Sequence, residues 1–242
     1  MKNCMQAYDL HVHSAFSGGS SSLEELASTA KQLGYKGICF VAYLMSKREE
    51  EILKAEIERT KTLFNIDIFL GFEARNKREL EILKRRRKEF DILLVRGGDI
   101  RMNRIAVQTR GVQILTHPEY ERFDPGLNHV LARFAAENNV AIEINFREVL
   151  ITSKRTRENV LRNITKDVKL AKKFHTPIII CSGALSHWMM RDPYILASFA
   201  TQVGLELKEA KDAITKVPKR IIEEAKERRS EGWIMEGVKV LG

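Results

Sequence analysis

The stretch from Asp9 to Ser14, which reads DLHVHS, decides the fold of this chain because it carries two histidines at alternate positions. Alternate residues of a strand point to the same face, so the side chains of His11 and His13 would project together from the end of one strand. Two neighbouring imidazoles can hold one metal ion. The sequence therefore predicts an early buried strand whose carboxyl end faces a binding site.

Short apolar runs alternate with amphipathic stretches along the whole chain. Several runs are almost continuous in Ile, Leu, Val and Phe, as strands buried on both faces are. The expected strands are Met5–Leu10, Gly37–Ala42, Asp67–Phe72, Asp91–Val95, Val112–Leu115, Val140–Ile144 and Pro177–Cys181. Seven such strand–helix units without a long linker predict a distorted seven-stranded parallel α/β barrel, TIM-like, with outer helices.

Cap residues predict where the intervening helices begin. Ser22 and Glu25 form a capping box, and Gly34 ends the same helix. Two further helices are expected to begin with an aspartate cap followed by proline, at Asp124-Pro125 and at Asp192-Pro193. We expect one domain over residues 1–242, of which about 219–242 form a charged helical extension.

The charge balance favours a polyanionic partner. Lys and Arg total 41 against 32 Asp and Glu, which gives a net charge of +9. This balance favours nucleic acid first and a membrane surface second, and a merely solvated surface is the alternative. No apolar run reaches the roughly 18 residues of a membrane span, and the start does not resemble a signal peptide. We expect a cytoplasmic protein without membrane contact.

The three cysteines predict neither a disulfide framework nor a zinc site, because no C-x-x-C pair occurs. Each lies in or beside an expected strand, which favours buried free thiols. They are Cys4, Cys39 and Cys181.

Glu73 follows the third expected strand, and His117 follows the fifth. The carboxyl ends of the strands would meet at one opening of the barrel, its mouth, so both residues would lie beside the paired histidines. This pattern resembles the PHP family of metal-dependent phosphoesterases, which use a distorted seven-stranded barrel. In that family an H-x-H, a glutamate after strand three and a later histidine bind metals. The resemblance implies that His11, His13, Glu73 and His117 match metal ligands.

The chain departs from the PHP pattern at two places. Ala42-Tyr43-Leu44 replaces an acid–histidine pair, and Ser182-Gly183-Ala184-Leu185 replaces a closing Ser-Asp-Ala-His. A metal cluster for phosphoester hydrolysis needs several such ligands. We therefore expect a vestigial site without catalytic residues or a cofactor, whose side chains hydrogen-bond across the mouth. The alternative is a PHP-type phosphoesterase with a reduced site and one residual zinc or manganese ion.

A second resemblance lies in two later blocks. Arg122–Arg133 (RFDPGLNHVLAR) and Asn139–Phe146 (NVAIEINF) are similar to the signature of the ribonuclease P protein component 3 family. Ile180–Ala184 with Trp188 and Arg191–Tyr194 fits the next block of that family. The resemblance extends from roughly residue 91 to 218. Members of this family are themselves degenerate PHP-like barrels, so the two resemblances agree.

This resemblance implies an archaeal subunit of ribonuclease P, the hydrolase that acts in tRNA processing as an endonuclease and removes the 5′ leader of precursor tRNA. An RNA subunit carries the catalysis with Mg, so the chain alone is not expected to cleave. The implied partners are the ribonuclease P RNA, precursor tRNA indirectly, and a small RRM-like protein subunit. The two proteins would form a heterodimer or heterotetramer.

Basic residues recur where the expected strands end and helices begin, and arginine suits phosphate because of its planar fork of donors. Arg101 and Arg104 lie three apart and would share one helix face. Each such residue could instead be a solvated charge, as could the run Lys84–Lys88 beside its acidic neighbours. The candidate RNA-binding residues are Arg101, Arg104, Arg122, His129, Arg147 and Arg191.

Overall fold

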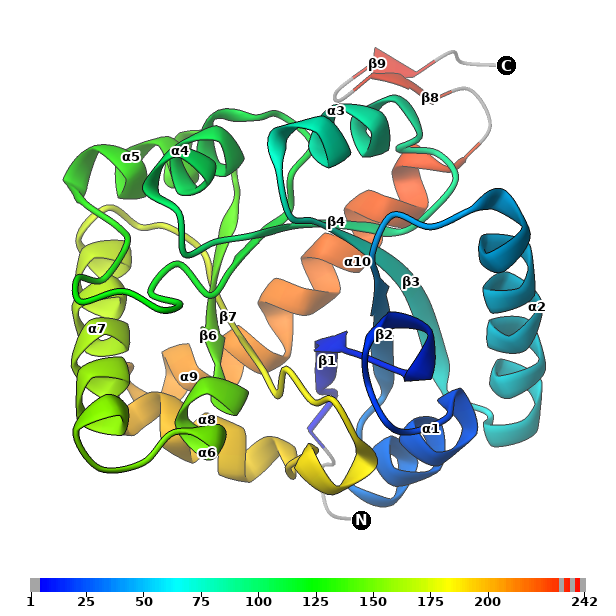
Figure 1. Ribbon diagram of the computed structural model, residues 1–242, viewed down its shortest axis with the longest axis horizontal. Helices are drawn as coiled ribbons and strands as arrows, with labels where there is room; N and C mark the ends of the chain where they lie inside the picture. The colour runs from blue at the N-terminus through cyan, green and yellow to red at the C-terminus, as the bar shows by residue number, and fades with distance from the viewer. Residues whose placement is uncertain (1–4, 231–232, 236–237, 240–242) are drawn as a thin grey trace.

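Seven parallel strands form the wall of a barrel, in a computed structural model that describes residues 5–230, 233–235 and 238–239 (Figure 1). Their order around the sheet is their order along the chain. The strands are β1 (Tyr8–Val12), β2 (Gly37–Ala42), β3 (Asp67–Ala74), β4 (Ile92–Arg96), β5 (Ile114–Thr116), β6 (Ala141–Asn145) and β7 (Ile178–Cys181). The expected seven-stranded α/β barrel is therefore confirmed.

β1 and β7 share fewer backbone pairings than the other neighbouring strands of the barrel do. Val12 and Ala184 form one isolated parallel bridge, and the His13 amide donates to the Ala184 carbonyl oxygen over 2.8 Å. The Asp9 carboxyl group accepts from the Ser182 amide over 3.2 Å, and burial raises the pKa of Asp9 to about 6. These contacts nearly close the barrel beside the expected binding site.

Helices surround the barrel (Figure 1). They are α1 (Leu23–Gln32), α2 (Lys47–Phe64), α3 (Lys77–Arg85), α4 (Ile100–Gln108), α5 (His129–Glu137), α6 (Phe146–Ile151), α7 (Lys154–Lys173), α8 (Pro193–Gln202), α9 (Leu207–Ile214) and α10 (Lys216–Arg228). The turns η1 (Ala15–Ser17) and η2 (His187–Met189) are short 3-10 helices. Ser22 forms the expected capping box of α1, and Asp192 caps α8 as expected.

The helix expected at Asp124-Pro125 begins later, at His129, with Asn128 as its cap. The Asp124 side chain instead accepts from the Gly126 amide within a loop. Gly126 has a left-handed backbone with φ of 75°, and a Cβ there would lie 1.8 Å from the Pro118 carbonyl oxygen. A right-handed helix cannot pass through that conformation, so the local cap pattern was a misleading signal.

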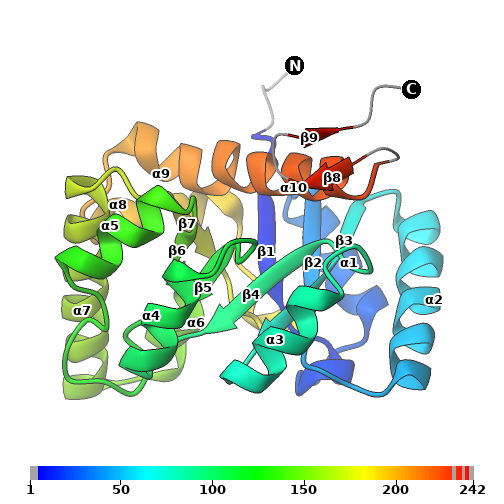
Figure 2. The same cartoon turned by 90° about the horizontal axis from the view of Figure 1, so that it is seen from above.

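Aliphatic side chains fill the barrel interior, and α10 crosses its amino end (Figure 2). Ile221 and Ile222 of α10 belong to the same buried cluster as Leu10, Cys39 and Cys181. Both of these cysteines are free and buried, as expected, whereas Cys4 lies outside the described residues. No described helix has both the length and the apolar character needed to cross a membrane.

The expected C-terminal extension has two parts. Residues 219–228 lie within α10, which packs against the barrel. Two short antiparallel strands follow where more helix was expected, β8 (Trp233–Met235) and β9 (Val238–Lys239). The rest of the expected extension, beyond 230, lies outside the described residues.

The barrel mouth and a candidate nucleic-acid surface

The paired histidines meet at the mouth, as the sequence predicts. His11 and His13 are at most 1% exposed, and their Nε2 atoms lie 2.9 Å apart. The Nδ1 atom of His11 lies 2.7 Å from Glu143 Oε1, and Nδ1 of His13 lies 3.1 Å from the Val41 carbonyl oxygen. A carbonyl oxygen only accepts, so His13 carries its proton on Nδ1 and its Nε2 is an acceptor.

The contact between the two Nε2 atoms then requires that His11 donate, and His11 carries protons on both nitrogens. Burial lowers the pKa of His11, but the charge and hydrogen bond of Glu143 outweigh it and raise the pKa overall. Burial and the His11 charge together hold the pKa of His13 well below its usual range. The pair is thus an imidazolium that donates to a neutral imidazole.

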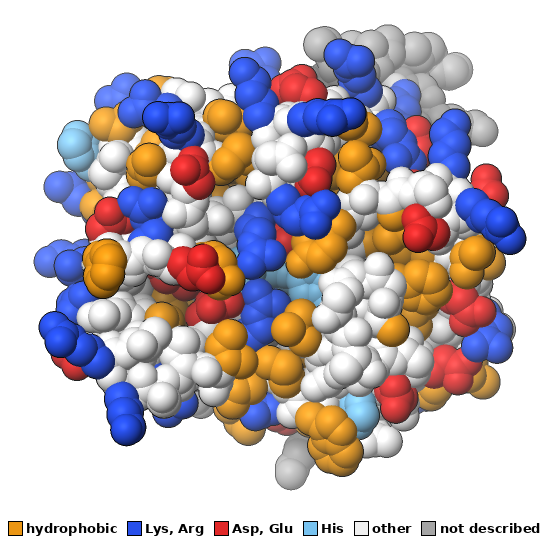
Figure 3. All heavy atoms as spheres, in the orientation of Figure 1, with side chains coloured by type: hydrophobic (Ala, Val, Ile, Leu, Met, Phe, Trp, Pro, Cys, Tyr) orange, Lys and Arg blue, Asp and Glu red, His pale blue; other side chains and the backbone are white. Residues whose placement is uncertain are grey.

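The other two expected members also converge on the mouth. Glu73 of β3 accepts a 2.5 Å hydrogen bond from the Thr116 hydroxyl, and its Oε1 lies 4.0 Å from His11 Nε2. His117 follows β5 in a left-handed conformation with φ of 42°, and its ring centroid lies 5.3 Å from that of His11. Histidine and Lys or Arg side chains lie together at the centre of this face (Figure 3).

Arg147, one of the candidate RNA-binding residues, is buried inside the mouth. It is 7% exposed on the first turn of α6. Its Nη2 lies 3.1 Å from His117 Nε2, and its Nη1 donates to the Gly183 carbonyl oxygen over 3.1 Å. A guanidinium only donates, so His117 Nε2 accepts and Nδ1 faces Glu148 at 3.3 Å.

Two acids of the mouth were missed by the sequence analysis. Glu143 lies on β6, and burial raises its pKa, but the His11 charge prevails and holds the pKa at about 2. Glu148 of α6 contacts both Arg147 and His117. The available signal was an acid inside the apolar strand at 141–145, because a charge there must find a buried partner.

The mouth does not fit the metal cluster that the PHP resemblance implies. His117 Nε2 accepts from Arg147, so a metal ion at that nitrogen would have to displace the guanidinium. The charges of Arg147 and His11 lie beside the carboxylates that a metal would otherwise neutralise. Among the described residues, two groups still keep their ligand atoms within 4.8 Å of one another: His11, His13 and Glu73, and His11, His117 and Glu143.

Aromatic and glycine residues occupy the positions of the lost ligands. The Tyr43 ring lies 5.4 Å from that of His13, and the Arg75 guanidinium lies 4.6 Å from the Tyr43 centroid. Gly183 has φ of 62°, and a Cβ there would approach the Asn145 amide to 2.4 Å. A larger side chain at residue 183 would therefore have to displace the Asn145 amide and adopt a strained left-handed backbone.

Three of the six candidate RNA-binding residues are exposed. Arg101 and Arg104 lie on α4, and His129 is the first residue of α5. These two helices contact each other, so the three side chains belong to one part of the surface. This arrangement leaves them accessible to a phosphate backbone.

The other two candidates, besides Arg147, are partly exposed and hold loops together. Arg122 forms a bidentate pair with Asp124 at 2.7 and 2.8 Å and also donates to the Gly98 carbonyl oxygen. Arg191 donates to the Trp188 and Met190 carbonyl oxygens, each over 2.8 Å. Both therefore have a structural role whether or not they touch a ligand.

The basic run Lys84–Lys88 is largely used within the molecule. Arg86 pairs with Glu50 and Glu89 at 2.6 Å, and Arg87 donates to Gln113 over 2.6 Å. These two arginines therefore hold neighbouring elements together and are not freely solvated charges.

A stronger concentration of exposed charge lies on α7. This helix carries eight Lys and Arg against two acids, Glu158 and Asp167, and Asp167 is buried. Four exposed cations share one face at helical spacing, at 162, 166, 169 and 173, and within the described residues none forms an ion pair with a carboxylate. Figure 3 shows Lys and Arg side chains along the edge where Figure 1 places α7.

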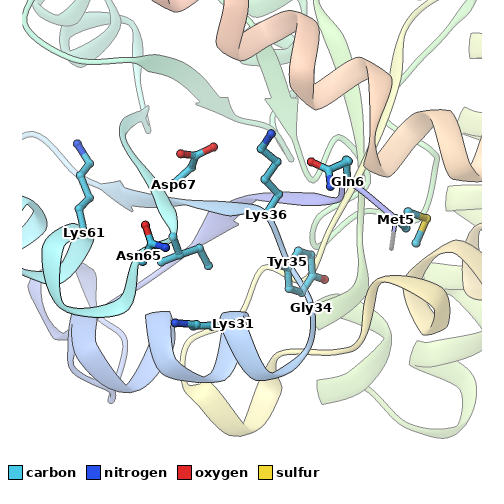
Figure 4. A pocket seen from close by; sticks show the side chains of 10 residues that line it. Met5, Gln6, Lys31, Gly34, Tyr35, Lys36, Lys61, Asn65 and Asp67 are labelled. Atoms are coloured by element: carbon cyan, nitrogen blue, oxygen red, sulfur yellow. The ribbon is translucent and has the colours of Figure 1, made fainter. Parts of the chain in front are cut away.

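A separate hollow of about 410 Å³ opens near the amino ends of β2 and β3 (Figure 4). Lys31, Lys36 and Lys61 border it from three segments. Lys31 donates to the Phe64 carbonyl oxygen, and Lys61 pairs with Glu58. Two of its three lysines are thus engaged internally, so the hollow is a weaker candidate than α7.

The fold and the mouth define a class of protein: a seven-stranded parallel α/β barrel with buried His, Glu and Arg side chains at its mouth. A beta-aspartyl dipeptidase from Fervidobacterium islandicum shares this fold, with a TM-score of 0.60 and 13% identity over 91% of this chain and 73% of that one. The chain belongs to the family described as RNase P subunit p30, whose model matches residues 6–230.

Relatives match along nearly the whole chain. Ribonuclease P protein component 3 of Methanosarcina mazei is 36% identical over 97% of this chain and 95% of that protein. The protein of the same name from Methanothermobacter thermautotrophicus is 34% identical over 98% and 96%. A chain in the cryo-EM structure of archaeal Ribonuclease P with mature tRNA matches with a TM-score of 0.80 and 28% identity, over 97% of this chain and 98% of that one.

Proposed function

We propose that this chain is a protein subunit of ribonuclease P that supports the catalytic RNA in removing the 5′ leader of precursor tRNA. The observation that carries the proposal is the family match over residues 6–230, which takes in the barrel and α10. The likeness to a chain of the archaeal complex also spans both molecules almost completely. The endoribonuclease activity would belong to the complex, and we expect no catalytic residue in this chain.

The RNA surface that the geometry favours combines the cations of α7 with Arg101 and Arg104 of α4. Exposed cations without an internal carboxylate partner can release counterions from an RNA backbone at little cost to the fold. Arg122, His129 and Arg191 remain candidates at loop and helix ends, where they would position RNA rather than read bases. Arg147 is buried, so RNA could reach it only by entering the mouth of the barrel.

The protein partner that we propose is the small RRM-like ribonuclease P subunit, in a heterodimer or heterotetramer, in the cytoplasm. Two exposed aromatic side chains support a further interface, because Phe123 is 90% and Trp188 80% exposed. Aromatic residues of this kind are enriched at protein interfaces and also stack on unpaired bases. Precursor tRNA would be contacted indirectly, through the assembled complex.

The mouth needs no metal in this proposal, because Arg147 and His11 supply its positive charge. Mg would serve the RNA of the complex. After exposure to zinc or manganese and removal of free ions, the mouth should hold far less than one ion per chain. One ion per chain that is lost in His13→Ala would contradict this part of the proposal.

Reconstitution tests the main proposal. The ribonuclease P RNA and its other protein subunits are assembled with and without this chain, and 5′ leader removal is measured at several Mg concentrations. We expect faster cleavage with the chain present and none by the chain alone. Phosphoester hydrolysis by the isolated chain with bound manganese, abolished in His13→Ala, would favour the PHP-type phosphoesterase instead.

A further inference from the structure

An open groove lies along α7, beside the loop at 117–128. Its volume is about 700 Å³, which is within the usual range of ligand sites. Pro125 of the loop and Leu170 of α7 are half-buried and supply apolar side chains to its lining. The other lining residues are four lysines of α7, at 166, 169, 172 and 173.

The lysines contribute both apolar and charged surface to this groove. Lysine side chains lay their aliphatic stems along apolar neighbours and keep the ammonium group in water. Lys166, Lys169 and Lys173 are exposed, and within the described part of the chain they form no ion pair with a carboxylate. Lys172 differs, because it pairs with Glu209 at 2.6 Å. The groove therefore offers an apolar lining with three accessible cations.

Phe123 lies beside α7 but is not covered by it. The Arg122 carbonyl oxygen accepts from Asn163 of α7 over 3.3 Å. On the other side of Phe123, the Arg122 hydrogen bonds lower the pKa of the Asp124 carboxyl group, and the nearby charge of Lys166 lowers it further. Both chain neighbours of Phe123 thus lie close to α7 (Figure 1), yet its own side chain is 90% exposed.

The loop that carries Phe123 is held in place without a ligand. Asn103 of α4 donates to the Pro118 and Gly126 carbonyl oxygens of this loop, over 3.1 and 2.9 Å. The bond between Asn163 and the Arg122 carbonyl oxygen attaches the same loop to α7. A ligand that packs on a loop fixed from two sides loses little conformational entropy on binding.

These features fit an unpaired RNA strand better than a duplex. An unpaired strand exposes the faces of its bases, which stack on aromatic side chains, together with the phosphates that lysines neutralise. In a duplex the base faces are covered by neighbouring bases, so Phe123 would have no partner. An acidic protein segment would pair with the lysines, but its carboxylates offer nothing to an aromatic ring.

We propose that the groove between α7 and the loop at 117–128 binds an unpaired segment of RNA. One base would stack on Phe123, and phosphates would lie beside Lys166, Lys169 and Lys173. The inference rests on the proposed function for the source of the strand, which would be a loop or junction of the ribonuclease P RNA. It goes further than that function, because cations alone would hold any phosphate backbone, whereas Phe123 selects the unpaired form.

Fluorescence anisotropy with the full chain and a labelled oligouridylate tests the proposal. The wild type should bind this single strand more tightly than the same strand annealed to oligoadenylate. Phe123→Ala should weaken binding of the single strand roughly tenfold and leave binding of the duplex unchanged. Phe123→Tyr should bind as the wild type does, because it keeps an aromatic ring.

Leu63→Ala is the matched control for the loss of an exposed apolar side chain. Leu63 is 61% exposed on α2, which lies on the other side of the barrel from α7 (Figure 1). This variant should bind the single strand and the duplex as the wild type does.

The lysines give a second readout. Lys166→Gln with Lys169→Gln should weaken binding of single strand and duplex alike, and should lessen the slope of log affinity against log salt by about two. Phe123→Ala should leave that slope unchanged, because it removes no charge.

Three results would overturn the proposal. They are equal affinity of the wild type for single strand and duplex, single-strand binding that Phe123→Ala does not weaken, and displacement of the strand by an equal concentration of oligoglutamate. The last result would instead favour an acidic protein partner.

Leader cleavage by the reconstituted complex distinguishes this inference from the proposed function. If the chain accelerates cleavage but shows no preference for the single strand, the groove proposal alone fails. If the groove binds the single strand through Phe123 but the chain does not accelerate cleavage, the site stands and its assignment to the ribonuclease P RNA fails.

Discussion

Nη2 of Arg147 lies 3.1 Å from Nε2 of His117, so a guanidinium holds the nitrogen that a metal ion would need. The two residues come from neighbouring strand ends, β5 and β6, and are at most 7% exposed. An internal cation of this kind is permanent, whereas a metal ion exchanges with solvent. The guanidinium therefore supplies a fixed positive charge beside the buried carboxylates of the mouth.

Removal of the Arg147 guanidinium should destabilise the protein, because buried groups of the mouth would lose their positive partner. Arg147→Met leaves Glu148 and His117 buried without their cationic partner, and breaking a buried pair in this way costs about 3–5 kcal/mol. Urea denaturation would measure the free energy of unfolding. Arg147→Lys should recover only part of the loss, because an ammonium cannot reproduce the fork of donors. A loss below about 1 kcal/mol would show that other groups balance the carboxylates.

Charge reversal on α7 should weaken RNA binding. The triple variant Arg162→Glu, Lys166→Glu and Lys169→Glu lowers the net charge from +9 to +3, because each change removes two units. Affinity for the ribonuclease P RNA should fall roughly tenfold or more. The slope of log affinity against log salt should lessen by about three. Filter binding across a salt series measures both quantities.

The matched control places the same charge change at the amino end of the barrel. Lys208→Glu, Lys211→Glu and Lys219→Glu lie on α9 and α10 and also give a net charge of +3. If both triple variants bind RNA equally poorly, total charge matters and α7 is not the docking surface.

Truncation of two arginines on α4 should lower cleavage by the complex without changing the stability of this chain. Arg101→Ala with Arg104→Ala removes exposed side chains, so the free energy of unfolding should change by less than about 0.5 kcal/mol. Leader cleavage by the reconstituted complex should fall, and most strongly at high salt. Cleavage that stays at the wild-type rate over the whole salt series would exclude α4 as an RNA contact.

Glu50 should make folding sensitive to acid. Burial raises its pKa, but hydrogen bonds with Lys54 and Arg86, both at 2.6 Å, outweigh it and hold the pKa below the usual 4.5. Its contribution is therefore complete above pH 4.5 and is lost as pH falls through the lower folded value. Glu50→Gln should cost about 1–3 kcal/mol at pH 7 and little at pH 3, measured by urea denaturation at each pH. An equal cost at both pH values would contradict this assignment.

The strands were predictable because buried parallel strands are nearly continuous apolar runs, and this pattern needs no knowledge of the tertiary structure. Helix starts were less secure. Asp124-Pro125 and Asp192-Pro193 are locally alike, yet only the second begins a helix. The difference lies in Gly126, whose left-handed backbone is set by close contact with Pro118.

Only some of the residues at the mouth could be predicted from the sequence. The H-x-H motif and Glu73 follow from strand periodicity, but the position of Arg147 does not, because a lone arginine in a loop is usually exposed. Its burial depends on the Gly183 carbonyl oxygen and on His117, which are 36 and 30 residues away in the sequence. The cations of α7 were not among the candidates drawn from the sequence, because only the structure shows which of its charges are exposed and share one face.

The single backbone bridge between Val12 and Ala184 has a consequence for motion. Every other pair of neighbouring strands in the barrel shares at least two registered residues, and β2 and β3 share six. Amide hydrogens along the β1–β7 junction should therefore exchange with deuterium sooner than those of the central wall. His13 lies beside this junction and is buried. If the junction opened locally, water would reach His13 through the barrel wall without global unfolding.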